Sequence, residues 1–393
     1  MPHTDSADSF SVQRCLAVTA APIVGFLLFV LLCFHYKDFD PSEAGLGFQT
    51  VSRKVDDDGY RWCFSNSFED AHGRLEYLKK SRRKLGLWLG ASQLYAINDW
   101  SPGERIAVAH ADQLSAETGQ FGIALTAMPN GNFNEMLVVL TNILSRQAQL
   151  DFIIVGLVFD DLREPGIRES LHDSIPELSA DDVSKYGVGI QHLIGQKKDA
   201  DRSGGNNADT VERATISGTP QEHLEQSLTG LMDQFVPGFS ARNRARAAVE
   251  VALRREVTFT VGSILNAAGL RKNVAPPIPS SERRWNHAAF ESILKIAEDA
   301  GIRVLLYQAP HPQQDGPFYY DRGDYEQYFS EIAQLSQESS FIEFRSFEDL
   351  VPLGYWGLNN AGDLDPFHFE VEGHRLLGSA VHQYLSDVFQ DAR

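Results

Sequence analysis

Three residues of this chain have the types and the order needed for nucleophilic acyl chemistry. Ser92 follows a short apolar run, and Asp365 and His368 stand three residues apart near the other end of the chain. A serine hydroxyl attacks a carbonyl when a base takes its proton, and an imidazole oriented by a carboxylate can be that base. The alternative is that Ser92 is only a helix N-cap, Asp365 part of a turn and His368 a packing residue. The nucleophile hypothesis therefore requires a fold that brings these segments together.

The pattern of apolar runs predicts such a fold. Runs typical of buried parallel strands alternate with helical patterns. The predicted strands are 85–89, 121–127, 152–158, 304–308 and 341–344, and the predicted helices are 104–118, 134–149, 282–300, 325–339 and 371–389. This alternation is typical of an α/β fold with a parallel sheet between two helical layers. Such sheets bind ligands at the carboxyl ends of their strands, where Ser92 would lie.

One long segment, 163–281, interrupts the alternation. It contains helical patterns at 221–235 and 242–265 but no convincing strand, so we predict a helical insertion within a main domain of 85–393. Inside the insertion, 195–220 is polar and rich in glycine, which predicts a mobile loop. The proline-rich stretch 275–279 is typical of a stiff connector that returns the chain to the sheet.

The amino-terminal region predicts a membrane anchor. After a tail of residues 1–14, residues 15–36 contain no formally charged side chain and are long enough to span a bilayer as a helix. A cleaved signal peptide is the alternative, but the apolar run ends in bulky residues without a small-residue cleavage site. Basic residues on the two flanks do not decide the orientation. Residues 37–84 are expected to form a leader that packs on the main domain.

Composition excludes several other functions. The 393-residue chain has a formal net charge of −18, which argues against a nucleic-acid surface because phosphates would be repelled. Its three cysteines cannot form a disulfide framework. No spacing of acidic and histidine residues is typical of a zinc site, and no glycine-rich phosphate loop is present. We therefore predict no metal, no nucleotide and no other cofactor.

The order of the motifs along the chain resembles a known superfamily. A serine follows the first strand, Gly131 the second and a polar residue, Asp160, the third, and D-x-x-H precedes the last helix. This order resembles that of the SGNH, or GDSL-like, hydrolases, most closely the membrane-anchored branch that includes the DltD and alginate-acetylation proteins. The resemblance covers about 85–389 without the insertion. It implies a flavodoxin-like three-layer sandwich.

The resemblance also implies roles for individual residues. Ser92 would be the nucleophile, His368 the general base and Asp365 the group that orients the imidazolium. The backbone N–H groups of Ser92 and Gly131 would hold the oxyanion, with Asn130 as the next candidate donor.

Two positions depart from the family pattern. The family often has asparagine where this chain has Asp160, and a carboxylate there would repel the tetrahedral intermediate. Asp160 is therefore turned away, protonated, or evidence against ordinary ester hydrolysis. The first block reads G-A-S-Q and lacks the aspartate of the G-D-S motif, as is common in the DltD-like branch.

Three further polar residues lie near the predicted site in sequence. Arg163 is either an ion-paired surface residue or a cationic group that steers an anionic substrate. His311 follows a predicted strand and is either a group that supports the catalytic residues or contacts the acceptor, or a loop histidine whose ring is hydrogen-bonded to the backbone. His374, six residues after His368, is expected on the surface.

The resemblance implies a membrane-anchored serine-dependent acyltransferase or esterase. It would move an O-acyl group, foremost acetyl, to or from a cell-envelope or extracellular polysaccharide, in a periplasmic or extracytoplasmic domain. A glycan acceptor, an acyl donor and a membrane-bound O-acyltransferase are the implied partners. The alternative is a non-catalytic scaffold for that membrane enzyme, which Asp160 favours. An esterase or lipase that acts on lipids is a third and weaker hypothesis, because the sequence shows no second amphipathic anchor.

Overall fold

The computed structural model describes the catalytic candidates and most predicted elements. The described residues are 20, 24–35, 53–55, 61–63, 68–95, 105–128, 130–146, 148–163, 166–177, 180–198, single positions between 241 and 264, 275–313, 318–358 and 364–390. The chain divides into two compact units, Met1–Gly45 with Asn207–Thr258, and Leu46–Asn206 with Phe259–Arg393. All candidate site residues belong to the second unit.

In the first unit, residues 24–35 are helical and most of their apolar side chains are exposed. Cys33 is buried against Ala241 and Ala245, and Phe29 packs on this cluster. Among the described residues, no helix is both long and apolar enough to cross a bilayer. The tail 1–14 and residues 15–19, 21–23 and 36 of the predicted anchor lie outside the described residues.

The second unit is built on a five-stranded parallel sheet. Its strand order is β4 (Phe121–Met128), β3 (Lys84–Ala91), β5 (Phe152–Leu157), β6 (Arg303–Gln308) and β7 (Ile342–Ser346). In chain order within this sheet that is 2-1-3-4-5, the order of flavodoxin-like folds. All five strands coincide with the predicted apolar runs to within a few residues. The α/β class and the parallel sheet are thereby confirmed.

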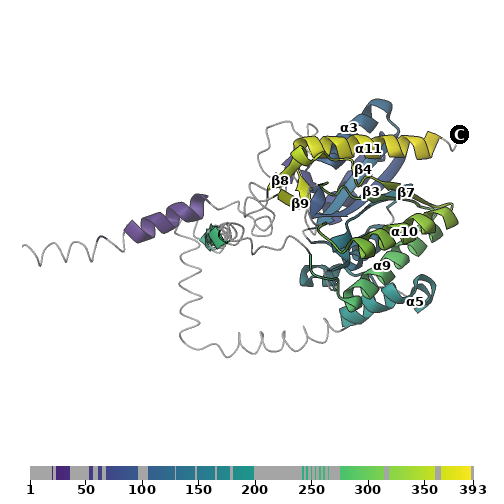
Figure 1. Cartoon of the computed structure of the whole chain (residues 1–393), viewed down its shortest axis with the longest axis horizontal. Coiled ribbons are helices and arrows are strands. Elements are labelled where there is room, and N and C mark those ends of the chain that lie inside the picture. Colours follow the sequence, from purple (N-terminus) through teal and green to yellow (C-terminus); the bar gives the residue numbers. More distant parts are fainter. Residues whose placement is uncertain are drawn as a thin grey trace, which may run out of the picture. The chain divides into compact units, whose positions relative to one another are not determined.

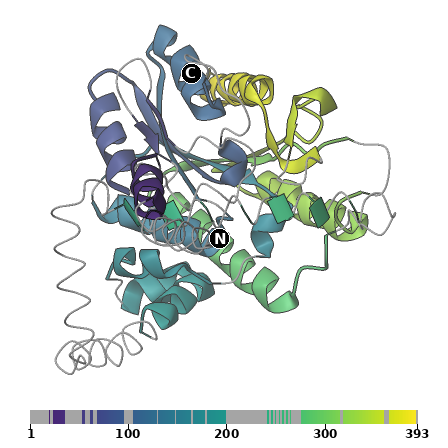
Figure 2. The same cartoon turned by 90° about the vertical axis from the view of Figure 1, so that its left-hand side faces the viewer.

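Helices cover both faces of the sheet (Figures 1 and 2). One face carries α3 (Ala107–Thr118) and α11 (Val371–Gln390), which pack on each other. The other carries α4 (Phe133–Ser145), α9 (Ser280–Asp299) and α10 (Arg322–Glu338), joined at the β4 side by α2 (Phe68–Leu78). Each face of the sheet has its own apolar core, so the strands are buried on both sides, as parallel strands require.

Alternation along β3 divides its side chains between these cores. Leu85, Leu87 and Leu89 enter the core under α4 and α9, whereas Trp88 enters the core under α3 and α11. Gly86 lies on the latter face, where a Cβ would come within 1.9 Å of the ring of Phe152. The ring of Phe152 therefore occupies the space that a side chain at position 86 would need.

Two small antiparallel pairs flank the main sheet. The leader contributes β1 (Arg53–Val55) and β2 (Arg61–Cys63), followed by α2, whose apolar side chains enter the main core. Near the other end, β8 (Trp356–Leu358) pairs with β9 (Leu364–Phe369), and β9 leads directly into α11. Asp365 and His368 both lie on β9, a short strand that the sequence did not indicate.

The secondary structure described within the insertion is helical. It contains η3 (Glu169–Ser174), α5 (Ala180–Tyr186) and a helix over 188–198, and no strand among its described residues. The predicted loop 195–220 is wrong at its start, because 195–198 continue that helix, with Gln196 hydrogen-bonded to His192. Its remainder, 199–220, and the helical pattern at 221–235 lie outside the described residues. The connector 275–279 is extended and ends where α9 begins.

Candidate active site

A small cavity at the carboxyl edge of the sheet gathers most of the predicted site residues. Its volume is about 70 Å³. Its lining comes from four segments that follow strands or precede α11: Ala91, Ser92, Gln93, Asn130, Gly131, Val158, Asp160, Asp161, Phe367 and His368. A larger cavity of about 600 Å³ lies at the opposite edge, lined by residues such as Lys84, Phe121 and Arg303. None of the predicted site residues lines that larger cavity.

Ser92 is placed by the end of β3. It is the first residue of η1 (Ser92–Leu94), a 3₁₀ turn closed by Tyr95 N–H donating to the Ser92 carbonyl at 2.8 Å. The sequence pattern suggested that a helix opens here; the residues described up to Tyr95 form only this turn. A Cβ on Gly90 would lie 2.5 Å from the Leu94 side chain, so glycine allows η1 to fold back on the strand end. The Ser92 side chain is thereby held at the cavity, with only 7% of the residue exposed.

Asp365 and His368 form a buried pair on β9. His368 Nδ1 lies 2.9 Å from Asp365 Oδ2, and each residue is 6% exposed. Asp365 Oδ1 accepts from the backbone N–H groups of Phe367 (2.8 Å) and His368 (3.1 Å). Because a carboxylate only accepts hydrogen bonds, Nδ1 is the donor, and in the tautomer with its proton on Nδ1 the lone pair is on Nε2. Among the described residues, that buried Nε2 has no hydrogen-bond partner.

In the turn after β4, the Gly131 N–H is not free for the oxyanion as the sequence predicted. The Gly131 N–H donates to the carbonyl of Met128 at 3.1 Å and closes a turn, which argues against Gly131 as the oxyanion donor. Asn130, before it, has a left-handed backbone with φ of 48° and is exposed at the cavity. Asparagine tolerates this conformation better than most residues. Asn130 is therefore the better donor candidate on this side.

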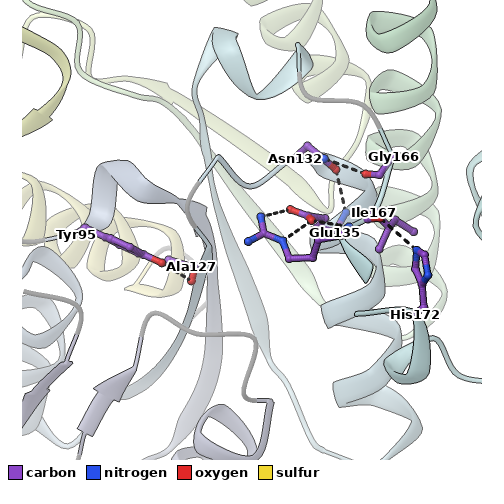
Figure 3. A network of polar contacts seen from close by, with 8 residues as sticks. Tyr95, Ala127, Asn132, Glu135, Gly166, Ile167 and His172 are labelled. Atoms are coloured by element: carbon purple, nitrogen blue, oxygen red, sulfur yellow. Dashed lines mark hydrogen bonds and ion pairs between the residues drawn. The ribbon is translucent and has the colours of Figure 1, made fainter. Parts of the chain in front are cut away.

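A polar network anchors this turn to the insertion (Figure 3). The Asn132 side chain caps α4 by accepting from Glu135 N–H and donates to the carbonyl of Gly166. Buried Glu135 accepts from Arg168 at 2.6 Å (Nε to Oε1) and 2.7 Å (Nη2 to Oε2). Sequence reasoning missed this network, although Asn132-x-x-Glu135 is a recognisable capping pattern. Its effect is to fix the Asn130 turn against residues 166–168.

Asp160 does line the cavity, and its charge is paired. Its Oδ1 accepts from Arg163 Nε at 2.9 Å, and Arg163 Nη1 also donates to the carbonyl of Pro277. Of the two interpretations of Arg163, an ion-paired residue or a group that steers an anionic substrate, the structure therefore favours the ion-paired residue. Arg163 does not line the cavity. An ion-paired carboxylate repels an oxyanion less than an isolated one, because the guanidinium compensates part of its charge.

The two other histidines occupy unexpected environments. His374 is fully buried rather than on the surface: its Nδ1 accepts from Ala107 N–H at 3.2 Å, and its Nε2 lies 3.0 Å from the Tyr95 carbonyl. It therefore joins α11 to the start of α3 and to the end of the Ser92 turn. His311 is 5% exposed and lines a second, smaller cavity beside the first.

Metal and cofactor chemistry was not expected from the sequence. Within the described ranges, no group of three or more histidine, cysteine or acidic side chains could hold a metal ion. The prediction of no metal and no cofactor stays a prediction.

Comparison with known proteins gives limited information. No protein-family model and no curated protein matches the sequence. A carbohydrate esterase family 2 enzyme with a carbohydrate-binding domain from Corynascus thermopiles (Myceliophthora fergusii) is similar in structure, at 8% identity and a TM-score of 0.36, covering 79% of this chain and 68% of that one. A candidate acylhydrolase from Bacteroides fragilis has 9% identity and a TM-score of 0.33, covering 84% and 100% of the two chains. A candidate platelet activating factor from Streptococcus pneumonia has 11% identity and a TM-score of 0.31, covering 81% and 92%. At these values the three carry no argument about activity.

Proposed function

We propose that this chain is a serine-dependent esterase or O-acyltransferase in which Ser92, His368 and Asp365 are the catalytic residues. One observation carries the proposal. His368, whose buried Nε2 has no hydrogen-bond partner among the described residues, lines the same small cavity as Ser92. A buried nitrogen without a partner is costly in a purely structural histidine, because its desolvation is not compensated. In a general base, the same nitrogen must be available to receive the serine proton.

The reaction then follows from the atoms around the cavity. His368 Nε2 takes the Ser92 proton while Oγ attacks the acyl carbonyl. Asp365 stabilises the imidazolium through its Oδ2, and the Ser92 N–H together with Asn130 donates to the oxyanion. The tetrahedral intermediate expels the leaving alcohol, which takes the proton from Nε2. An acyl ester on Ser92 remains, and water or a second alcohol releases the acyl group by the reverse sequence.

The cavity favours a short acyl group. A water-sized group needs about 10–15 Å³ on this measure, so about 70 Å³ accommodates roughly five such groups. The carbonyl carbon of an acetyl ester, its two oxygens and its methyl group fit in that space, with Ser92 in the lining. We therefore take acetyl as the acyl group to test first.

The setting of the reaction is also part of the proposal. Residues 15–36 would anchor the chain in a membrane, and the catalytic unit would act outside the cytoplasm on an envelope or extracellular polysaccharide. A membrane-bound O-acyltransferase would supply the acyl group. The uncharged stretch 15–36 and the resemblance in motif order support this setting.

A burst experiment tests the enzymatic proposal. Full-length protein in detergent is mixed with p-nitrophenyl acetate, and release of p-nitrophenol is followed in the first turnover. We expect a stoichiometric burst that disappears in Ser92→Ala and is retained in Ser379→Ala, a serine exposed on α11. A burst of equal size in Ser92→Ala would exclude Ser92 as the nucleophile.

A non-catalytic scaffold is the second candidate function, favoured by the carboxylate of Asp160 at the cavity. The Ser92→Ala variant in cells separates the two functions. A scaffold would support full polymer acylation without the serine, whereas an enzyme would not.

A further inference from the structure

His311 is a buried polar side chain that the catalytic scheme does not use. Only 5% of the residue is exposed, and apart from a weaker interaction with the backbone of Pro312, neither ring nitrogen meets a partner with full hydrogen-bond geometry among the described residues. Its backbone N–H donates to the Glu348 carbonyl, which fixes the main chain but leaves the ring unsatisfied. The ring packs against Phe318, Tyr320 and Tyr325 at centroid distances of 4.6, 5.6 and 6.0 Å. These aromatic contacts supply no partner for its nitrogens.

The unpartnered ring borders a cavity of about 10 Å³. That is the space of one water-sized group, and the remaining lining is mostly apolar, from residues such as Leu157, Ala309 and Phe367. An unsatisfied buried polar atom costs about 1–3 kcal/mol, and a polar group that enters this space can hydrogen-bond to one of the two ring nitrogens, which point in divergent directions. The cavity has the size and polarity for one hydroxyl oxygen.

The protonation states of the residues around this cavity indicate which class of ligand it can bind. Burial lowers the pKa of His311 to about 4, although the backbone of Pro312 opposes this shift. Burial also raises the pKa of the neighbouring Tyr320 well above its usual value. Both groups are neutral at pH 7, and no charged side chain lines the cavity; Arg322, whose charge also lowers the pKa of His311, lies outside the lining. A neutral imidazole presents one donor and one acceptor, which match the acceptor and donor of a hydroxyl group.

This cavity adjoins the one that contains Ser92. The two share Gln93, Val158 and Phe367 in their linings. Gln93, which follows the nucleophile, donates from Nε2 to the carbonyl of Pro310 at 3.1 Å. Pro310 directly precedes His311, so one hydrogen bond links the neighbours of both residues. A molecule with two adjacent hydroxyl groups could therefore place one near Ser92 and the other at His311.

We propose that His311 and its cavity bind a hydroxyl group of an uncharged polyol, and so position the neighbouring hydroxyl as the acyl acceptor. This inference rests on the proposed function and assigns the acceptor class within it. In the transfer step, His368 Nε2 takes the proton of the acceptor hydroxyl as its oxygen attacks the acyl ester on Ser92. The intermediate then releases Ser92 Oγ, which takes that proton back from Nε2. His311 binds the adjacent hydroxyl throughout and exchanges no proton.

The test compares transfer with hydrolysis. Full-length protein in detergent receives p-nitrophenyl acetate as donor and methyl α-D-glucopyranoside as acceptor, and acetylated glucoside and free acetate are both quantified. His311→Phe keeps a ring of similar size without nitrogens, and His311→Gln keeps one donor and one acceptor. His287→Phe is the matched control, because His287 is half-exposed on α9 and paired with Glu291.

In His311→Phe we expect the ratio of transfer to hydrolysis to fall about five- to tenfold, the effect of losing one neutral hydrogen bond. The acceptor KM should rise, while the p-nitrophenol burst stays within about twofold of the parent. His311→Gln should recover part of the ratio, and His287→Phe should leave it unchanged. If His311→Phe has the parental ratio and a normal burst, the role of His311 is contradicted and the proposed function is not. If the parent protein itself shows no burst, the proposed function is contradicted.

A binding measurement covers the case in which the parent shows no burst. In protein with ¹³C-labelled histidine, the His311 ring resonance, assigned through His311→Phe, should shift on titration with methyl α-D-glucopyranoside. Absence of that shift at saturating glucoside would overturn the inference without reference to activity.

Discussion

Asp365→Asn should abolish acylation because of how the two carboxylate oxygens are used. Oδ1 accepts from two backbone N–H groups, and Oδ2 faces His368 Nδ1 at 2.9 Å. In the asparagine variant, the amide oxygen must stay at the backbone donors, so the NH₂ group faces Nδ1. The imidazole can accept that hydrogen bond only as the tautomer with its proton on Nε2. Nε2 then has no lone pair for the serine proton.

The magnitude follows from a known case of this tautomer inversion. In a serine protease triad the equivalent change lowers kcat about 10⁴-fold, which corresponds to about 5.5 kcal/mol of transition-state stabilisation. We expect a loss of this order in the second-order rate constant for inactivation by a fluorophosphonate. Thermal unfolding should change little, since both backbone hydrogen bonds are kept.

The matched control is Asp324→Asn, which alters an exposed aspartate at the start of α10 and should react at the parental rate. An Asp365→Asn variant that folds and reacts within tenfold of the parent would refute the assignment of Nε2 as the base.

The remaining predictions concern stability and pH. Gly86→Ala should lower the free energy of unfolding in urea by about 1–3 kcal/mol, because its Cβ would overlap an aromatic ring, whereas Gly195→Ala, with nothing within 4 Å, should not. Arg168→Met should cost about 2–3 kcal/mol, because the buried Glu135 carboxylate loses the guanidinium and keeps only the bond from the backbone N–H of residue 168; adding Glu135→Gln should restore part of that loss, and equal instability of single and double variants would contradict this. The lowered pKa of His311, about 4 against 6.5 unfolded, means that the unfolded chain binds a proton first on acidification, so stability is lost as pH falls from about 6.5 to 4. This group alone contributes about 3 kcal/mol to that loss, and urea titrations of His311→Phe should show a correspondingly smaller pH dependence.

The sheet was predictable because its evidence is local. In continuous apolar runs such as 152–158, the side chains on both faces of the strand must be buried away from water. The helices that alternate with these runs then predict parallel strands. The same reasoning predicted that Ser92 and His368 meet at one edge of the sheet. Ser92 follows a strand that ends at this edge, and His368 precedes a helix that begins there.

Details of hydrogen bonding were not predictable in the same way. The Gly131 N–H closes a turn onto Met128, and this depends on backbone angles that the residue types do not determine. His374 appeared to be a surface residue by helical spacing, yet it meets Tyr95 and Ala107, which are distant in sequence. The partner of buried Glu135 is Arg168, which lies in an insertion that periodicity could not place. A local backbone conformation decided the first case, and long-range contacts decided the other two.

Mapping of the fluorophosphonate adduct by tandem mass spectrometry tests the central claim most directly. The protein is labelled at full length, digested and sequenced, with His368→Ala treated in parallel. The account predicts a single adduct on the peptide that contains Ser92, absent from the His368→Ala sample. An adduct on another residue, or equal labelling of Ser92 without His368, would contradict the claim that this serine and this imidazole act as one catalytic unit.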